Sequence, residues 1–228
     1  MSVSKIKATV FSQEQLASDV FSMWLEVGSI ASEAKPGQFI SVYSNDDSKL
    51  LPRPISICEI DRENGRLRIV YRVVGYGTKE FSGCKAGDTL EIMGPLGNGY
   101  TLKKDKAILV AGGIGVPPML ELAKELDCEK TIVLGYRDEL FLNKEFEQYG
   151  KVVIATEDGS CGTKGNVLDA IRAESVDGQV IYSCGPTPML RALKQYAADK
   201  GIEAWISLEE KMACGIGACL ACVCKSKD

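Results

Sequence analysis

Four cysteines near the end of the chain have the spacing that most directly suggests chemistry. Cys214, Cys219, Cys222 and Cys224 all lie in the segment "CGIGACLACVC". The first three follow the pattern C-x4-C-x2-C, which is typical of plant-type [2Fe–2S] sites in which thiolates hold the irons. Two glycines inside this segment allow the backbone to wrap closely and to donate N–H groups toward sulfur. We therefore expect Cys214, Cys219 and Cys222 to be metal ligands.

Two alternatives to an iron–sulfur site remain open for this segment. Zinc also binds thiolates, although structural zinc sites usually bring two separated pairs of ligands; the segment could also hold no metal. Cys224 is a candidate fourth ligand, but its side chain would project to the same side as that of Cys222 along an extended chain. The spacing alone therefore leaves Cys224 as a doubtful member of the set.

Two further segments, "VAGGIGVPP" and "YSCGPTPM", join an apolar run to a helical pattern through a glycine-containing turn. Gly112, Gly113 and Gly115 leave backbone N–H groups uncovered, so a pyrophosphate could approach the positive end of the helix. Cys184 and Gly185 would lie at the carboxyl edge of the same sheet, where ligands bind in open α/β folds. Each turn alone could be purely structural, but together they predict a dinucleotide crevice.

A third candidate site combines the run "RPIS" with the later segment "VYRVVGYGTKEF". Arg53 offers a two-pronged donor for a pyrophosphate, and Ser56 offers a hydroxyl for a heteroaromatic nitrogen. Gly75, Gly77 and Thr78 could form a second anion-binding turn that leads into a short helix. The alternative is an edge strand whose polar side chains simply face solvent.

The composition excludes several classes of chemistry. The 228 residues include no histidine, which rules out Ser-His-Asp and Cys-His hydrolases, H-E-x-x-H zinc sites and Rieske clusters. The formal net charge is −4 and the sequence has no basic run, so it gives no indication of binding to nucleic acid or to an anionic membrane surface. Nine cysteines, five of them scattered singly, do not resemble the paired framework of a secreted domain. We expect a cytoplasmic protein whose reaction runs on bound cofactors.

The pattern of elements that must position these residues changes near residue 100. Before it, six short runs alternate with period two between turns rich in Gly, Pro and Asn, which predicts a small antiparallel barrel or sandwich. After it, five apolar runs alternate with helical segments, which predicts a parallel, doubly wound sheet. We expect an antiparallel barrel over 1–100, an α/β domain over 101–208 and an iron–sulfur loop over 209–228.

These motifs occur in the order found in the ferredoxin–NADP⁺ reductase superfamily. "PGQF" and "RPIS" resemble its flavin-binding barrel, "GYGT" resembles its phosphate loop, and "GGIGVPP" and "CGPTPM" resemble its nucleotide-binding turns. Within the superfamily, the tail "SLEEKMACGIGACLACVC" resembles that of the electron-transfer subunits of bacterial class 1B dihydroorotate dehydrogenases. The resemblance covers nearly the whole chain, and the combination is more specific than any one motif.

The resemblance implies a set of cofactor-binding residues. For FAD these are Arg53, Pro54, Ile55, Ser56, Val70, Tyr71, Arg72, Gly77 and Thr78. For NAD they are Gly112, Gly113, Gly115, Pro117, Cys184 and Gly185, the last two near the nicotinamide. For the [2Fe–2S] cluster they are Cys214, Cys219 and Cys222. The resemblance implies a fourth cluster ligand beyond Asp228, so we expect a truncated C-terminus rather than ligation by Cys224. Ile55 stands where many members have an aromatic residue on the flavin, so that contact is expected to be apolar here.

The resemblance also implies an activity and a partner. In the resembled enzymes, an FMN-containing catalytic subunit oxidises dihydroorotate to orotate in pyrimidine biosynthesis, and electrons pass through the cluster and FAD to NAD⁺. The implied assembly is a heterotetramer with two copies of each subunit. Arg137 could meet a 2′-phosphate whereas Asp138 would repel one, and the resemblance favours NAD over NADP.

Two other functions remain open. The chain could be the flavin and iron–sulfur subunit of a sulfhydrogenase or of an NADPH:ferredoxin oxidoreductase. It could also be a zinc-binding interaction module without enzymatic activity.

Overall fold

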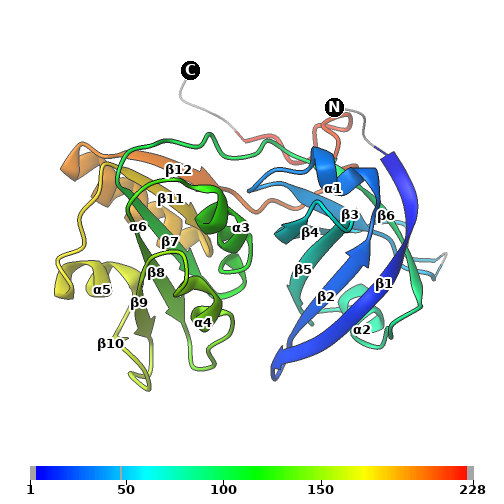
Figure 1. Cartoon of the computed structure of the whole chain (residues 1–228), viewed down its shortest axis with the longest axis horizontal. Helices are drawn as coiled ribbons and strands as arrows, with labels where there is room; N and C mark the ends of the chain where they lie inside the picture. Colours follow the sequence, from blue (N-terminus) through cyan, green and yellow to red (C-terminus); the bar gives the residue numbers. More distant parts are fainter. Residues whose placement is uncertain (1–3, 47, 225–228) are drawn as a thin grey trace. The chain divides into compact units, whose positions relative to one another are not determined.

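The computed structural model describes residues 4–46 and 48–224, which divide into two compact units (Figure 1). Unit 1 contains residues 4–15, 19–46, 48–99 and 209–224, and unit 2 contains 16–18 and 100–208. The cysteine segment therefore groups with the first unit, although it follows the second unit in sequence.

Unit 1 is a closed barrel with the strand order β1-β2-β5-β4-β3-β6. Each of the six runs predicted before residue 100 forms one strand, which confirms the antiparallel barrel. The strands are β1 (Ser4–Ala17), β2 (Val20–Glu26), β3 (Phe39–Val42), β4 (Arg53–Asp61), β5 (Arg66–Arg72) and β6 (Thr89–Leu96). Two short helices, α1 (Ser29–Glu33) and α2 (Tyr76–Ser82), complete the unit.

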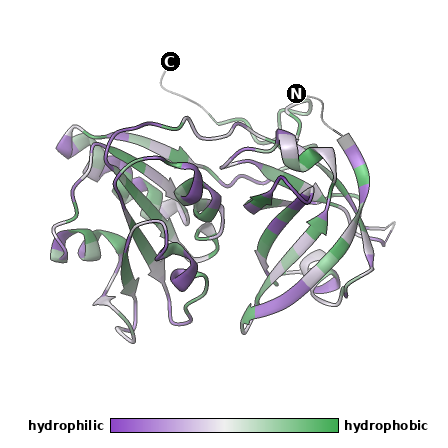
Figure 2. Ribbon diagram, in the orientation of Figure 1, coloured by the Kyte–Doolittle hydropathy of each residue, from purple (hydrophilic) through white to green (hydrophobic). Residues whose placement is uncertain are grey.

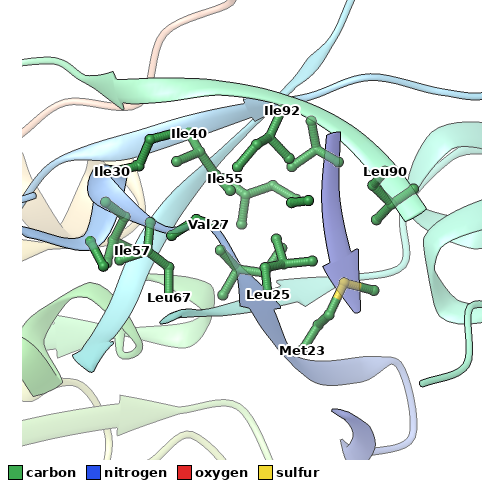
Figure 3. Packing of buried hydrophobic residues seen from close by; sticks show 14 of the residues in the cluster. Met23, Leu25, Val27, Ile30, Ile40, Ile55, Ile57, Leu67, Leu90 and Ile92 are labelled. Atoms are coloured by element: carbon green, nitrogen blue, oxygen red, sulfur yellow. The ribbon is translucent and has the colours of Figure 1, made fainter. Parts of the chain in front are cut away.

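The interior of the barrel is filled by aliphatic side chains at alternate positions of its strands. Figure 3 shows Met23 and Leu25 of β2, Ile40 of β3, and Ile55 and Ile57 of β4 pointing into one cluster. Burying such a side chain contributes about 1.5–3 kcal/mol, so these positions fix which face of each strand points inward. A shift of one residue in any strand would expose its whole apolar set.

Unit 2 is a parallel sheet of six strands in the order β10-β9-β8-β7-β11-β12, which confirms the doubly wound α/β fold. The strands are β7 (Ala107–Gly112), β8 (Lys130–Tyr136), β9 (Lys151–Thr156), β10 (Thr163–Lys164), β11 (Val180–Cys184) and β12 (Glu203–Ser207). The helices are η1 (Gly113–Gly115), α3 (Pro118–Glu125), α4 (Asn143–Phe146), α5 (Val167–Ala173) and α6 (Thr187–Lys200). The two-residue strand β10 was not predicted.

Helices cover the sheet on both sides. Figure 1 shows α3 in front of the sheet and α6 behind it, and Figure 2 shows the central strands as hydrophobic. Every residue of β7 and β11 is buried, as expected for strands that are covered on both faces. None of the helices in the described ranges has the length and apolar character needed to cross a lipid bilayer.

Candidate functional site

The two glycine turns of unit 2 meet where the strand order of the sheet reverses. The neighbouring parallel strands β7 and β11 are paired so that Ala111 lies beside Cys184. A Cβ atom on Gly115 would lie 2.4 Å from the carbonyl oxygen of Cys184, so only glycine permits this approach of the two backbones. Ligands bind beyond the carboxyl ends of the strands at such a switch point. The structure therefore brings together the two turns that the sequence assigned to one crevice.

The side chain of Met189 in α6 packs against both glycine turns at this junction. A Cβ on Gly112 would lie 2.7 Å from the Met189 Sδ, and a Cβ on Gly185 would lie 2.5 Å from the Met189 Cε. Gly185 also has a φ of 156°, a conformation that favours glycine. Pro117 is buried directly before α3, which begins at Pro118. The sequence singled out these glycines and the proline, but it missed Met189, which only the helical register of α6 could have indicated.

The segment that leads into unit 2 is fixed to β11 by two tyrosines that the sequence analysis missed. The Tyr100 hydroxyl donates to the carbonyl of Ser183 at 3.0 Å. The Tyr182 hydroxyl donates to the carbonyl of Thr101 at 2.7 Å and accepts from the N–H of Lys103 at 3.0 Å. Burial raises the pKa of Tyr100 well above its ordinary value, so this phenol remains a hydrogen-bond donor. These hydrogen bonds fix β11, which ends at Cys184, to the segment 100–103.

In unit 1, Arg53 and the predicted phosphate turn lie together. Arg53 is the first residue of β4, and a Cβ on Gly77 would lie 3.1 Å from its Nε, so the arginine side chain rests against that glycine. The Thr78 Oγ1 accepts from the N–H groups of Val74 at 3.0 Å and Gly75 at 3.2 Å. The threonine hydroxyl therefore shapes the turn itself. A guanidinium beside a glycine turn is an arrangement that can bind a phosphate.

Alternation along β4 decides which of its side chains face outward. Ile55 is 7% exposed, lies opposite Ile40 and packs in the barrel core (Figure 3). Its neighbours Pro54 and Ser56 point the other way, the first exposed and the second half-buried. The expected apolar contact through the Ile55 side chain is therefore not what the structure provides. Ile55 can offer only its backbone to a molecule on the outer face.

The three candidate residues of β5 differ in what they can offer. Tyr71 is buried in the barrel core, where its hydroxyl donates to the Gln13 Oε1 at 2.9 Å. The Arg72 Nε lies 3.1 Å from a carboxylate oxygen of Asp19. Val70 is buried but does not belong to the core cluster, so it lies on the outer face of β5, the face that it shares with Arg72. Sequence alone could not separate these roles, because all three residues are adjacent.

The backbone of the cysteine segment depends on glycine. Gly215 and Gly217 have φ angles of 69° and 78°, in the left-handed region that other residues avoid. The N–H of Cys219 donates to the Cys214 Sγ at 3.4 Å. This backbone hydrogen bond, with others from the same loop, lowers the pKa of Cys214 to about 6. The loop thus favours the thiolate form, which is the form that binds metal.

Cys224 has the opposite environment. Its Sγ lies 3.5 Å from the Oε1 of Glu210, and desolvation together with this carboxylate raises the pKa of the thiol. A protonated thiol is a poor ligand, which supports the expectation that Cys224 does not complete the site. The expected ligand beyond Asp228 lies outside the described residues. Within residues 4–46 and 48–224, no group of three or more His, Cys, Asp or Glu side chains is arranged to hold a metal ion.

Two family models match the chain. The model described as an oxidoreductase FAD-binding domain matches residues 7–100. The model described as the iron-sulfur cluster binding domain of dihydroorotate dehydrogenase B matches residues 209–228. These matches confirm the predicted flavin and iron–sulfur cofactors.

Curated relatives match over nearly the full length. The proteins from Fusobacterium nucleatum and Lysinibacillus sphaericus are each 44% identical to this chain, over 96% and 97% of it and 89% of each relative. A protein from Streptococcus pneumoniae is also 44% identical, over 95% of this chain and 87% of its own. All three are named dihydroorotate dehydrogenase B (NAD(+)), electron transfer subunit.

Solved structures share the fold. A structure described as an NADH-dependent reduced ferredoxin-NADP oxidoreductase superposes with a TM-score of 0.87 at 32% identity, over 94% of this chain and 80% of that one. The ferredoxin reductase of carbazole 1,9a-dioxygenase superposes with a TM-score of 0.75 at 20% identity, over 91% and 70% of the two chains. The second likeness indicates the fold alone.

Proposed function

Because this chain belongs to the family of electron transfer subunits of dihydroorotate dehydrogenase B, we propose that it passes electrons between a [2Fe–2S] cluster, FAD and NAD⁺ on behalf of a catalytic partner subunit. Oxidation of dihydroorotate to orotate on the partner would release two electrons and two protons. NAD⁺ takes up both electrons and one proton to become NADH. The observation that carries the proposal is the presence, in one chain, of a segment that matches an iron–sulfur binding domain, a barrel that matches an FAD-binding domain and a parallel sheet with a switch point between β7 and β11.

FAD, when bound, would supply the exchange between the electron pair of a hydride and the single electrons that an iron–sulfur cluster carries. Arg53 would bind its pyrophosphate, with Gly77 leaving room for the arginine and Thr78 holding the turn. Ser56 would offer its hydroxyl to the flavin ring from the outer face of β4, beside Pro54. Ile55, Val70, Tyr71 and Arg72 would complete the FAD site, with Ile55 and Tyr71 contributing from the backbone because their side chains lie in the barrel core.

NAD would bind in the switch-point crevice of unit 2. Gly112, Gly113, Gly115 and Pro117 would shape the first turn, with Cys184 and Gly185 near the nicotinamide from the second. Arg137 and Asp138 are both exposed just after β8. The Asp138 carboxylate would accept a ribose hydroxyl and repel a 2′-phosphate, which supports NAD over NADP.

Cys214, Cys219 and Cys222 would hold the cluster. Their loop fits this role because its N–H groups point at sulfur and favour the thiolate. The zinc-binding module without enzymatic activity is disfavoured by the match of this segment to an iron–sulfur binding domain.

The alternative of a subunit of a sulfhydrogenase or an NADPH:ferredoxin oxidoreductase is motivated by the 32% identical solved structure. The relatives named as electron transfer subunits share more sequence with this chain. Reduction of orotate by NADH, assayed with the catalytic subunit added, separates the two functions. Reduction of ferredoxin without reduction of orotate would favour the alternative.

Arg53→Ala should weaken FAD binding by about tenfold to a hundredfold, since a charge-assisted hydrogen bond contributes about 1.5–3 kcal/mol. Titration of the deflavinated protein with FAD measures this directly. Arg62→Ala is the matched control, because Arg62 is another barrel arginine and its Nη2 donates to the carbonyl of Ala34. Equal FAD affinities of the two variants would contradict the assignment of Arg53.

We further propose that the partner contains FMN and assembles with this chain as two copies of each subunit. Ile216, Leu220 and Val223 are 52%, 69% and 68% exposed on the cysteine loop, and exposed apolar groups of this kind mark interfaces. Placed there, the interface would bring the partner close to the cluster.

Leu220→Asp should weaken association with the catalytic subunit by roughly tenfold or more, as for a buried contact at the centre of an interface. Leu220 has a φ of 59°, which aspartate tolerates better than most residues, so the loop conformation should survive. Sedimentation of the mixed subunits gives the affinity, and iron analysis verifies the loop. Leu50→Asp is the control because Leu50 is 84% exposed on a different loop of unit 1. Unchanged assembly of the Leu220 variant would exclude this surface.

A further inference from the structure

The cysteine loop rests on the outer face of the barrel at one glycine. A Cβ on Gly215 would lie 3.1 Å from the Ser41 Oγ, 3.4 Å from the Leu96 Cδ1 and 3.7 Å from the Phe39 Cε2. Ser41 is 1% exposed although its side chain lies on the outer side of β3, away from the core cluster. The loop therefore contacts the barrel at β3 and β6. A Cβ on Gly217, by contrast, would meet no atom of the described residues within 4 Å.

The same row of outer side chains continues across the barrel to the proposed flavin site. Phe39 is paired with Leu96 of β6 on one side and with Ser56 of β4 on the other. Directly opposite residues of an antiparallel pair have Cβ atoms about 4.5–5.5 Å apart. Ser56 lies next to Ile57, which is paired with Ile69 of β5. One strand, β3, therefore separates the loop from the outer face of β4.

We propose that Phe39 and Ser41 form a contact surface on β3 for the cysteine loop. This contact sets the separation between the flavin and the iron–sulfur cluster. This inference rests on the proposed function, since it requires FAD on the outer face of β4 and the cluster on the cysteine loop. Phe39 and Ser41 are positioning residues in this account: they hold Gly215, and through it Cys214, close to the flavin face. Neither side chain needs to accept an electron.

The physical reason is the steep decrease of electron-transfer rates with distance. A loop anchored only through its cysteines would be free to rotate as a unit, and the cluster would then sample longer separations. Close packing of Gly215 restricts that freedom, because even a Cβ atom there would lie only 3.1 Å from the Ser41 Oγ and in van der Waals contact with Leu96. Fixed geometry between reacting groups is a large contribution that a protein can make to a rate.

The first test changes the barrel side of the contact. Ser41→Leu inserts a larger side chain beneath the loop without altering the cysteines, and Ser12→Leu makes the same change on β1. Stopped-flow mixing of the cluster-containing protein with NADH, followed by optical and electron paramagnetic resonance signals, separates flavin reduction from cluster reduction. Ser41→Leu should slow the flavin-to-cluster step about tenfold while flavin reduction keeps its rate. Equal flavin-to-cluster rates in the two variants would overturn the proposal.

The second test uses the protein after removal of iron. Gly215→Ala and Gly217→Ala share the cost of a left-handed backbone, but only the first also places its methyl group tightly against the barrel, 3.1 Å from the Ser41 Oγ. Amide hydrogen exchange in the segment 214–219 should be faster in Gly215→Ala than in Gly217→Ala. Equal exchange would show that the loop does not rest on β3, even if the cluster forms. Absence of flavin or cluster from the wild-type protein would instead refute the proposed function, so the two failures are distinguishable.

Discussion

Cys214→Ser should remove nearly all iron and acid-labile sulfide from the protein while leaving its flavin in place. The N–H of Cys219 and its neighbours stabilise negative charge on the Cys214 sulfur, so this position is prepared to bind metal as a thiolate. A serine hydroxyl is both harder and far less acidic, and it cannot replace that ligand. Iron and sulfide are measured per flavin, together with the electron paramagnetic resonance signal of the reduced cluster.

Cys224→Ser is the matched control, because it makes the same chemical change in the same loop. Desolvation and the Glu210 carboxylate raise the pKa of this thiol, so its loss should leave iron and sulfide contents close to those of the wild type. A Cys224→Ser variant that loses its cluster as completely as Cys214→Ser would show that Cys224 is a ligand. The assignment of only Cys214, Cys219 and Cys222 as ligands within this loop would then be wrong.

Gly115→Ala should weaken NADH binding by roughly tenfold to a hundredfold, because its methyl group would overlap the backbone at Cys184. The predicted contacts are 2.4 Å to the carbonyl oxygen and 2.5 Å to the carbonyl carbon, so the two turns must separate. Overpacking of this kind costs about 1–3 kcal/mol, and here the displaced atoms line the crevice. Calorimetric titration with NADH measures the change.

Gly201→Ala separates crevice geometry from the general stability of unit 2. Gly201 ends α6 with a φ of 66°, and a Cβ there would contact no atom of the described chain within 4 Å. Its replacement should cost about 1 kcal/mol of stability without changing the affinity for NADH. If Gly115→Ala lowers the melting temperature but binds NADH as tightly as Gly201→Ala, then the contact of the two turns is structural only.

The sequence was sufficient for the fold because each unit repeats one simple pattern. Period-two alternation such as that around Met23 and Leu25 specifies strands with one buried face. The fully apolar runs that became β7 and β11 specify strands covered on both faces. The two-residue strand β10 carries no such pattern and was missed.

Residues of the candidate sites could be predicted from the sequence where only one residue type can meet a structural requirement. Gly115 is an example, since only glycine allows two backbones to approach so closely. The inward orientation of the Ile55 side chain could not be read from the motif, because a motif identifies a segment but not which of its side chains face inward. The contact of the cysteine loop with β3 was not predicted either, since it depends on packing between segments far apart in sequence.

Anaerobic titration of the purified full-length natural protein with NADH tests the central claim most directly. The account predicts a coloured protein whose flavin absorption bleaches on addition of NADH, followed by the electron paramagnetic resonance signal of a reduced [2Fe–2S] cluster. NADPH at the same concentration should be less effective, since Asp138 would repel its 2′-phosphate. A colourless protein that contains zinc, with neither flavin nor iron, would contradict the account.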